Sequence, residues 1–217
     1  MMKNKIGEVE ILEAAWKLLA QEGIENFSMR KLSQLLNIKA PSLYWYVKSK
    51  EEIFNKLASQ VIQEILAEVL VTDDWREQLI LYGEIISQKL RQYPYSAHLL
   101  LRITPDNVDL LKINNELLKV IEILPLKDNQ KFASMTSFLN YIISFEIDYL
   151  AQKDNYEKID QKPEGWLDQL LVGYGENEPI VRMIHTNTLE SLGSDETFLW
   201  GLEIFVNGLA TLSAKSD

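Results

Sequence analysis

Five basic side chains lie close together near the start of the chain, in a window without any acidic residue. They are Arg30, Lys31, Lys39, Lys48 and Lys50, all within residues 28–50. The whole chain has 22 basic and 32 acidic residues and a formal net charge of −10, so this window is an exception. Clustered lysine and arginine bind phosphate groups, and arginine can also read the edge of a base. The window therefore indicates contact with a nucleic acid.

The basic charge belongs only to the N-terminal part of the chain. Residues 1–56 carry nine basic and seven acidic side chains, whereas residues 57–217 carry thirteen and twenty-five. A polyanion is repelled by the second part and tolerated by the first. We therefore expect two domains, a nucleic-acid-binding domain over residues 1–56 and an acidic domain with another role over residues 57–217.

The basic side chains are expected to sit on short helices joined by a tight turn. Ser28 can cap one helix, Asn37 tolerates the left-handed conformation of a turn, and Pro41 suits the first turn of the next helix. Ser49 and Glu52 then form a capping-box pattern at the start of a longer helix. This arrangement is typical of a helix-turn-helix, which places one helix in the DNA major groove.

The rest of the chain also has the periodicity of helices, and no stretch alternates as strands do. The fold class is therefore all-α. The expected boundaries are a first helix ending near Gly23, one from Trp75 to before Pro94, a short one over residues 95–102, one beginning at Thr104-Pro105, a long one from Asp128 to about Ala151, a loop over residues 153–178 with one turn around Trp166–Leu171, and two closing helices on either side of Gly193.

Composition disfavours several other classes of protein. No apolar run approaches the roughly 20 residues that span a bilayer, and acidic residues interrupt the N-terminus before any secretory apolar segment. The absence of cysteine excludes disulfides and thiolate metal sites. No nucleophile elbow, phosphate loop or zinc-protease motif is present, so nothing in the sequence supports catalysis. We expect a cytoplasmic protein that is not an enzyme and has no cofactor or metal.

Over residues 9–57, the chain resembles the DNA-binding head of the TetR (tetracycline repressor) family of bacterial transcriptional regulators. The resemblance rests on the sequence EGIENFSMRKLSQLLNIKAPSLYWYVKSKEEI. Two departures are Asn37 in place of the usual glycine and Ala40 where Ser or Thr is common. The resemblance implies a three-helix DNA-binding domain followed by a larger helical domain for ligand binding and dimerisation.

By this resemblance, the third helix, about Pro41 to Tyr46, reads DNA. Arg30 matches a position that reaches a guanine, whose O6 and N7 suit the paired N–H groups of guanidinium. Short side chains would allow a close approach to the groove at Ala40, Pro41 and Ser42. Phosphate contacts, which set affinity and register, are expected from Ser28, Tyr44, Tyr46, Lys48 and Lys50. Leu43 and Trp45 could serve either DNA or the core of the head.

Two helices of the acidic part carry apolar stripes at alternating spacings of three and four residues. Such stripes suit helices packed at a shallow angle. The resemblance implies that both helices pair with their copies in a four-helix bundle, which lets a homodimer read two DNA half-sites. The alternative is that both stripes are buried within one monomer. The expected interface residues are Phe138, Ile142, Phe145, Leu202, Phe205 and Leu209, with Gly201 and Gly208 allowing close approach.

The C-terminal sequence TFLWGLEIFVNGLATL further resembles the tetracycline repressors themselves. Positions that match their ligand pocket are Tyr82, Ile86, Leu100, Ile103, Glu116 and either Leu139 or Asn140. Leu100 stands in place of the metal-side histidine, and Ile103 in place of the threonine beside it, so a magnesium–tetracycline chelate is not expected. A small, mainly hydrophobic effector is expected instead, or a cationic one if Glu116 is buried. The alternative is that these residues are simple core.

Together these features predict a repressor that binds double-stranded, palindromic operator DNA as a dimer. An effector would release it by binding the DNA-free state more tightly. Activation, or repression that needs a corepressor, fits the same residues. An alternative of another class is an all-α small-molecule-binding protein or enzyme whose helix-turn-helix no longer reads DNA.

Overall fold

The computed structural model describes residues 6–69, 71–159, 171–186, 191 and 193–215, together with Trp166 and Gln169. Every regular element in these residues is a helix, which confirms the predicted all-α class. The helices are α1 (Glu8–Glu22), α2 (Met29–Leu35), α3 (Ala40–Leu43), α4 (Lys50–Glu68), α5 (Trp75–Gln92), α6 (Ser96–Arg102), α7 (Val108–Val120), α8 (Asp128–Ile159), α10 (Pro179–His185) and α11 (Asp195–Ser213).

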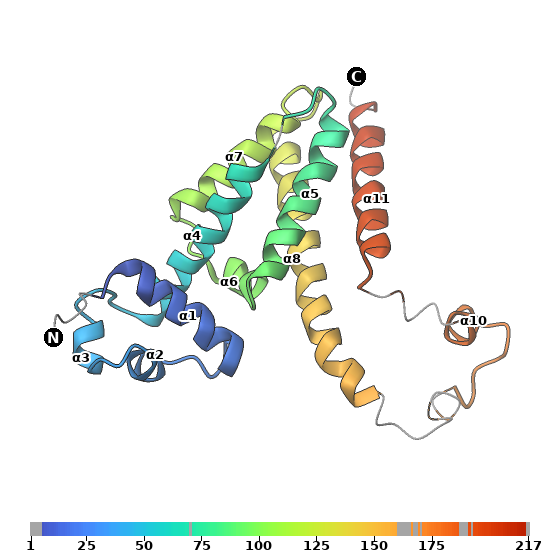
Figure 1. Cartoon of the computed structure of the whole chain (residues 1–217). Coiled ribbons are helices and arrows are strands. Elements are labelled where there is room, and N and C mark those ends of the chain that lie inside the picture. The colour runs from blue at the N-terminus through green and yellow to red at the C-terminus, as the bar shows by residue number, and fades with distance from the viewer. Residues whose placement is uncertain are drawn as a thin grey trace.

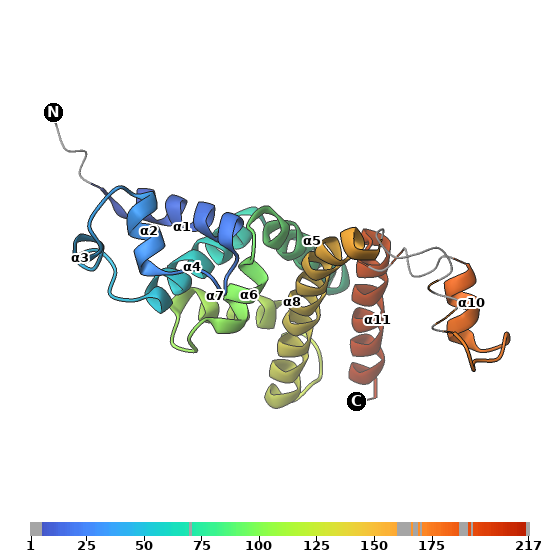
Figure 2. The same ribbon diagram turned by 90° about the horizontal axis from the view of Figure 1, so that it is seen from below.

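The first helices form a small head, and the longer helices form a body beside it (Figure 1). In both views the head lies at one end of the molecule, and α8 and α11 run next to each other towards the other end (Figures 1 and 2). Helix α10 lies apart from the body in both views. Helix α4 runs from the head into the body and contacts α5, α6 and α7.

The local signals around the turn behave as the sequence predicts. The Ser28 hydroxyl oxygen accepts from the Lys31 N–H at 3.3 Å and caps α2. Asn37 adopts a left-handed conformation with φ of 53°. Ser49 accepts from the Glu52 N–H at 3.1 Å, but the Glu52 carboxylate accepts from the Lys48 N–H at 2.7 Å, one residue earlier than in a full capping box.

Three boundaries differ from the prediction. Helix α3 ends at Leu43 and not near Tyr46. Helix α7 begins at Val108 and not at Thr104-Pro105, because the Asn107 side chain accepts from two backbone N–H groups and caps the helix there. Helix α8 continues to Ile159, past the expected end near Ala151. No proline or glycine lies between these points, and polar residues alone do not end a helix. The first part of the expected loop over residues 153–178 is therefore helical, and much of the rest lies outside the described residues.

Two apolar cores share helix α4. Ile53 and Leu57 belong to the core of the head, and Val61 and Ile65 belong to the core of the body. The α4 helix therefore crosses the boundary that charge alone places after residue 56. Leu99 of α6 also packs into the core of the head, so the two parts are joined by apolar contacts as well as by the chain.

Candidate nucleic-acid interface and effector cavity

The turn that follows α3 presents aromatic side chains to the outside. Leu43 is fully buried in the core of the head, whereas Tyr44 and Tyr46 are exposed and Trp45 is 88% exposed. This decides the alternative for Leu43 and Trp45, because Leu43 is core and Trp45 is not. A run of residues following an inward-facing leucine cannot all face inward on so short a helix, and this geometric signal could have placed Trp45 on the surface.

Three cations of the basic window are exposed and form no ion pair with any described residue. They are Arg30, Lys39 and Lys48. Two others are engaged within the head: Lys31 pairs with Glu22 at 2.6 Å, and the Lys50 ammonium donates to the Ile24 carbonyl at 3.2 Å. Free cations can neutralise phosphates without first breaking an internal contact, so the exposed three suit this role best.

The predicted DNA contacts Ser28, Ala40, Pro41 and Ser42 lie at the start of α2 and within α3, and of these two helices only α2 has a side-chain cap. The Ser28 oxygen caps α2, and its hydroxyl hydrogen remains able to donate to a phosphate. Ala40 and Ser42 are half-buried, and Pro41 is exposed in the first turn of α3. The Lys50 ammonium also lies 5.1 Å from the Phe54 ring centroid, so this side chain has a structural role in the head. A phosphate contact by Lys50 stays a prediction.

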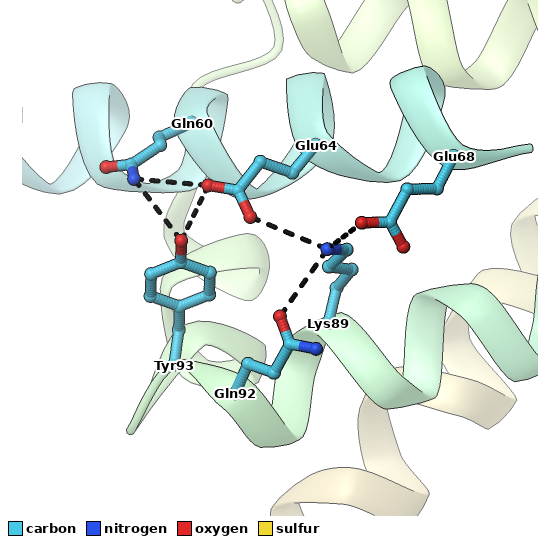
Figure 3. Close-up of polar contacts among 6 residues, drawn as sticks. All are labelled: Gln60, Glu64, Glu68, Lys89, Gln92 and Tyr93. Carbon is cyan, nitrogen blue, oxygen red and sulfur yellow. Dashed lines mark hydrogen bonds and ion pairs between the residues drawn. The ribbon is translucent and has the colours of Figure 1, made fainter.

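A polar cluster ties α4 to α5 beside the head (Figure 3). Its members are Gln60, Glu64 and Glu68 of α4, Lys89 and Gln92 of α5, and Tyr93 just after it. Lys89 is almost fully buried, donates to Glu68 and lies 3.7 Å from Glu64. Burial and the hydrogen bond that Tyr93 donates to Glu64, 2.6 Å long, raise the pKa of Tyr93 to about 12. This phenol therefore stays a proton donor at any physiological pH.

The same cluster reaches the head through Trp16 of α1. The Trp16 indole donates to the Gln60 amide oxygen at 3.1 Å, and the Trp16 and Tyr93 ring centroids are 4.7 Å apart. On α6, Arg102 pairs with Glu25 of the head at 2.9 Å. A displacement of α4 against α5 would therefore alter contacts of the head, which gives the body a physical connection to α1.

A cavity of about 640 Å³ lies between α4, α5 and α7. Its lining residues are Leu66, Val69, Val71, Thr72, Asp73, Trp75, Gln78, Tyr82, Lys112, Glu116, Lys119, Val120 and Ile123. A larger hollow of about 790 Å³ between α1 and α4 is lined mainly by polar and acidic side chains. The cavity at α5 and α7 combines aromatic and aliphatic walls with a few polar groups, as small-molecule sites do.

The structure brings two of the predicted ligand residues together in this cavity, Tyr82 and Glu116. Burial raises the pKa of Tyr82, and the negative charge of Glu116 raises it further. The other predicted residues do not line this cavity: Ile86 is fully buried, Leu100, Ile103 and Leu139 pack against the cores, and Asn140 is exposed.

Sequence reasoning missed several lining residues that share helix faces with the two it found. Trp75 and Gln78 precede Tyr82 on one face of α5, and Lys112 and Lys119 flank Glu116 on one face of α7. Both sets have spacings of three and four residues, which place them in a row along a helix. That spacing is the signal that could have extended the predicted site.

The described residues hold no group of three or more His, Asp or Glu side chains arranged to bind a metal ion. Within the same part of the chain, no helix combines the length and the apolar character that crossing a membrane requires.

Comparison with known families covers both parts of the chain. Residues 11–57 match the family described as bacterial regulatory proteins, tetR family, and residues 70–213 match the tetracyclin repressor-like C-terminal domain. The chain belongs to the TetR family of bacterial transcriptional regulators. The resemblance seen in the sequence is thereby confirmed for the head and for the C-terminal domain.

Individual TetR-family relatives are distant. An HTH-type transcriptional regulator from Saccharopolyspora erythraea is 32% identical over 97 residues, which are 45% of this chain and 41% of that relative. The chain thus matches less than half the length of this curated relative. Apo ActR from Streptomyces coelicolor has a TM-score of 0.75 at 21% identity, covering 96% of this chain and 98% of ActR. BioQ with its double-stranded DNA operator has a TM-score of 0.65 at 19% identity, covering 95% and 99%. These structures establish a shared fold.

In this TetR-family protein, the two apolar stripes predicted for dimerisation face largely inward. Phe138, Ile142 and Leu202 are 0% exposed within one chain, so they have no area left to give to a partner. Leu209 is also buried, and Phe145 and Phe205 pack partly buried against the same core. The spacing identified one face of each helix but not whether that face lies against the monomer or a second copy.

The outer face of α11 is apolar and uncovered in the single chain. Trp200, Ile204 and Leu212 of α11 and Phe132 of α8 are exposed, and a groove runs along Gly208 and Ala133. Gly208 has nothing within 4 Å of the position of an added Cβ, whereas Gly201 is closed over by Tyr141. Of the two glycines predicted to allow close approach, only Gly208 opens to the outside.

Proposed function

We propose that the chain is a ligand-responsive transcriptional regulator, a repressor that leaves a palindromic operator when an effector occupies the cavity of the body. The observation that carries the proposal is the double role of α4. Its N-terminal half builds the core of the head with Ile53 and Leu57, and its C-terminal half lines the cavity with Leu66, followed directly after the helix by Val69. One rigid helix therefore joins the DNA-binding surface to the ligand site.

The proposed release follows from differential binding. An effector that packs between α4, α5 and α7 favours whichever spacing of these helices fits it best. Movement of α4 would rearrange the polar cluster at Lys89 and Tyr93. It would also change the contacts that Trp16 of the head makes with this cluster. The effector can weaken DNA binding by no more than one ratio, its affinity for the DNA-free protein divided by its affinity for the DNA-bound protein. We also propose that the regulator acts in the cytoplasm and has no catalytic activity. Membership of the TetR family supports both of these properties.

This function is tested by footprinting on the DNA upstream of the chain's own coding sequence. Protection of an inverted repeat that disappears with a small molecule supports a ligand-responsive repressor. Protection that appears only with the small molecule would instead indicate a corepressor. Absence of protection on any DNA at low salt would contradict the proposal.

Replacing Trp45 by alanine should weaken operator binding about tenfold, which corresponds to about 1.4 kcal/mol. We propose that this side chain contacts DNA, because it is an exposed large aromatic in the turn that follows the recognition helix. Stability should change by less than about 0.5 kcal/mol, since little surface is buried. Leu43→Ala is the matched control and should cost roughly 2–5 kcal/mol of stability, because Leu43 is fully buried. Fluorescence anisotropy and thermal unfolding separate the two effects.

We further propose that the homodimer forms through the outer face of α11 and the adjoining face of α8. Ile204→Glu should place a charge in the centre of this apolar surface and raise the dimer dissociation constant about 30-fold or more. Leu111→Glu, an equally exposed leucine on α7, should leave the dimer intact. Analytical ultracentrifugation distinguishes the outcomes. A dimer of unchanged strength in Ile204→Glu would show that the interface lies elsewhere.

A further inference from the structure

We propose that the cavity between α4, α5 and α7 is selective for organic monocations with an apolar body. The binding preference is a property of the cavity itself. Its consequence for DNA release rests on the proposed function.

The walls of the cavity suit an apolar body. Aromatic surface comes from Trp75 and Tyr82 of α5. Aliphatic surface comes from Leu66 of α4, Val69 directly after that helix and Val120 of α7. A volume of about 640 Å³ falls within the range of sites that enclose drug-sized ligands. These features set the size and apolar character of the ligand but not its charge.

The charges at the cavity favour a cation over an anion. Both lysines of the lining are already neutralised, Lys112 by Asp109 at 2.9 Å and Lys119 by Glu116 at 2.7 Å. Asp73, which also lines the cavity, forms no ion pair with any described residue, so the local balance is negative. Residues 57–217 as a whole carry twenty-five acidic and thirteen basic side chains, so the surrounding field has the same sign.

Glu116 is not buried, so the condition under which the sequence predicted a cationic effector is not met, but the carboxylate is available to a cation in another way. In the Glu116–Lys119 pair, the two side chains are 38% and 63% exposed, and pairs of this kind contribute little to stability. Lys119 can therefore turn into solvent while a ligand cation takes its place. The negative potential of Glu116 also reaches the cavity wall, because it adds to the effect of burial in raising the pKa of the Tyr82 hydroxyl.

The aromatic wall offers a second contact for a cation. One face of the Trp75 ring is already occupied by the Arg76 guanidinium, whose carbon lies 4.7 Å from the ring centroid and whose charge is balanced by Asp74 at 3.8 Å. A ligand cation would therefore meet the other aromatic surface of the cavity, which Tyr82 provides. A ligand cation between Glu116 and the aromatic wall would be held by charge and by ring quadrupoles together. An anion in the same place would be opposed by both.

The test uses two probes of the same shape and opposite charge, tetraphenylphosphonium and tetraphenylborate. Calorimetric titration of the full chain should show that the phosphonium binds at least about tenfold more tightly than the borate, a difference of about 1.4 kcal/mol. Glu116→Gln should narrow this ratio severalfold. Glu84→Gln removes an exposed carboxylate elsewhere on α5 and should leave the ratio unchanged.

Equal or tighter binding of the borate, binding of neither probe, or a ratio unaffected by Glu116→Gln would overturn the proposed selectivity. Operator DNA added to the same samples reports separately on the proposed function. If the phosphonium binds through Glu116 but leaves the operator complex intact, the cation site stands and the link from this cavity to DNA release fails.

Discussion

Replacing Arg30 by alanine should weaken binding to the operator by about 10- to 100-fold, the effect expected when an arginine that reads a guanine is removed. Arg30 is exposed at the start of α2 and forms no ion pair with any described residue. Its loss therefore leaves no buried partner behind, and the stability of the fold should change by less than about 0.5 kcal/mol. Preference at one base pair of each half-site should relax.

Arg30→Lys is the matched control because it keeps the charge and removes the planar fork of donors. If Arg30 reads a base, the lysine variant should lose sequence preference while retaining much of its non-specific, salt-dependent affinity. If Arg30 only contacts phosphate, Arg30→Lys should behave like the unmodified chain. Unchanged affinity and salt dependence in Arg30→Ala would favour the alternative in which the head no longer reads DNA.

The largest loss of stability is expected for Arg91→Ala, at about 3–5 kcal/mol, the cost of breaking a buried ion pair. Glu146 of α8 is only 4% exposed and accepts from the Arg91 Nε at 2.8 Å and from the Ser87 hydroxyl at 2.6 Å. The Arg91 guanidinium also lies over the Tyr149 ring, 4.4 Å from its centroid. Removing Arg91 leaves a buried carboxylate without its counter-charge and removes the ion pair between α5 and α8.

Arg102→Ala is the control for this prediction. Arg102 pairs with Glu25 at a similar distance of 2.9 Å, but both side chains are exposed, so about 0–1 kcal/mol is expected. Denaturant unfolding at one fixed chain concentration compares the variants, since dimerisation adds to apparent stability. Combining Arg91→Met with Glu146→Leu should recover much of the loss, because the charge that is left without its partner, that of Asp195, is exposed to solvent. Equal midpoints for Arg91→Ala and Arg102→Ala would contradict the assigned role.

Local features of this fold could be predicted because local residues cause them. Ser28 caps α2 and Asn37 takes the left-handed turn, as predicted, whereas α3 ends at Leu43 and not at the expected Tyr46. The predicted start of α7 and the predicted end of α8 were wrong, because several weak local signals compete at each of these boundaries.

Contacts between residues that are far apart in the chain could not be predicted from the sequence. The cluster of Lys89 with Glu64 and Glu68 joins two helices whose relative placement no local pattern encodes. Spacing placed Phe138 and Leu202 on helix stripes but could not tell a monomer core from a dimer interface, and both are buried within one chain. Of the cavity, Tyr82 and Glu116 were predicted through the resemblance, while Trp75 and the two lysines were missed, although their spacing along α5 and α7 places them on the same helix faces.

The central claim is that the head reads symmetric DNA, and selection of bound duplexes from a random library by the full chain tests it most directly. The account predicts enrichment of an inverted repeat whose half-sites are about 10–10.5 base pairs, or a multiple of that, apart from centre to centre. Affinity for the enriched duplex should fall steeply with salt, as cations on the head replace counterions of the phosphates. Recovery of no enriched sequence at low salt would contradict the claim.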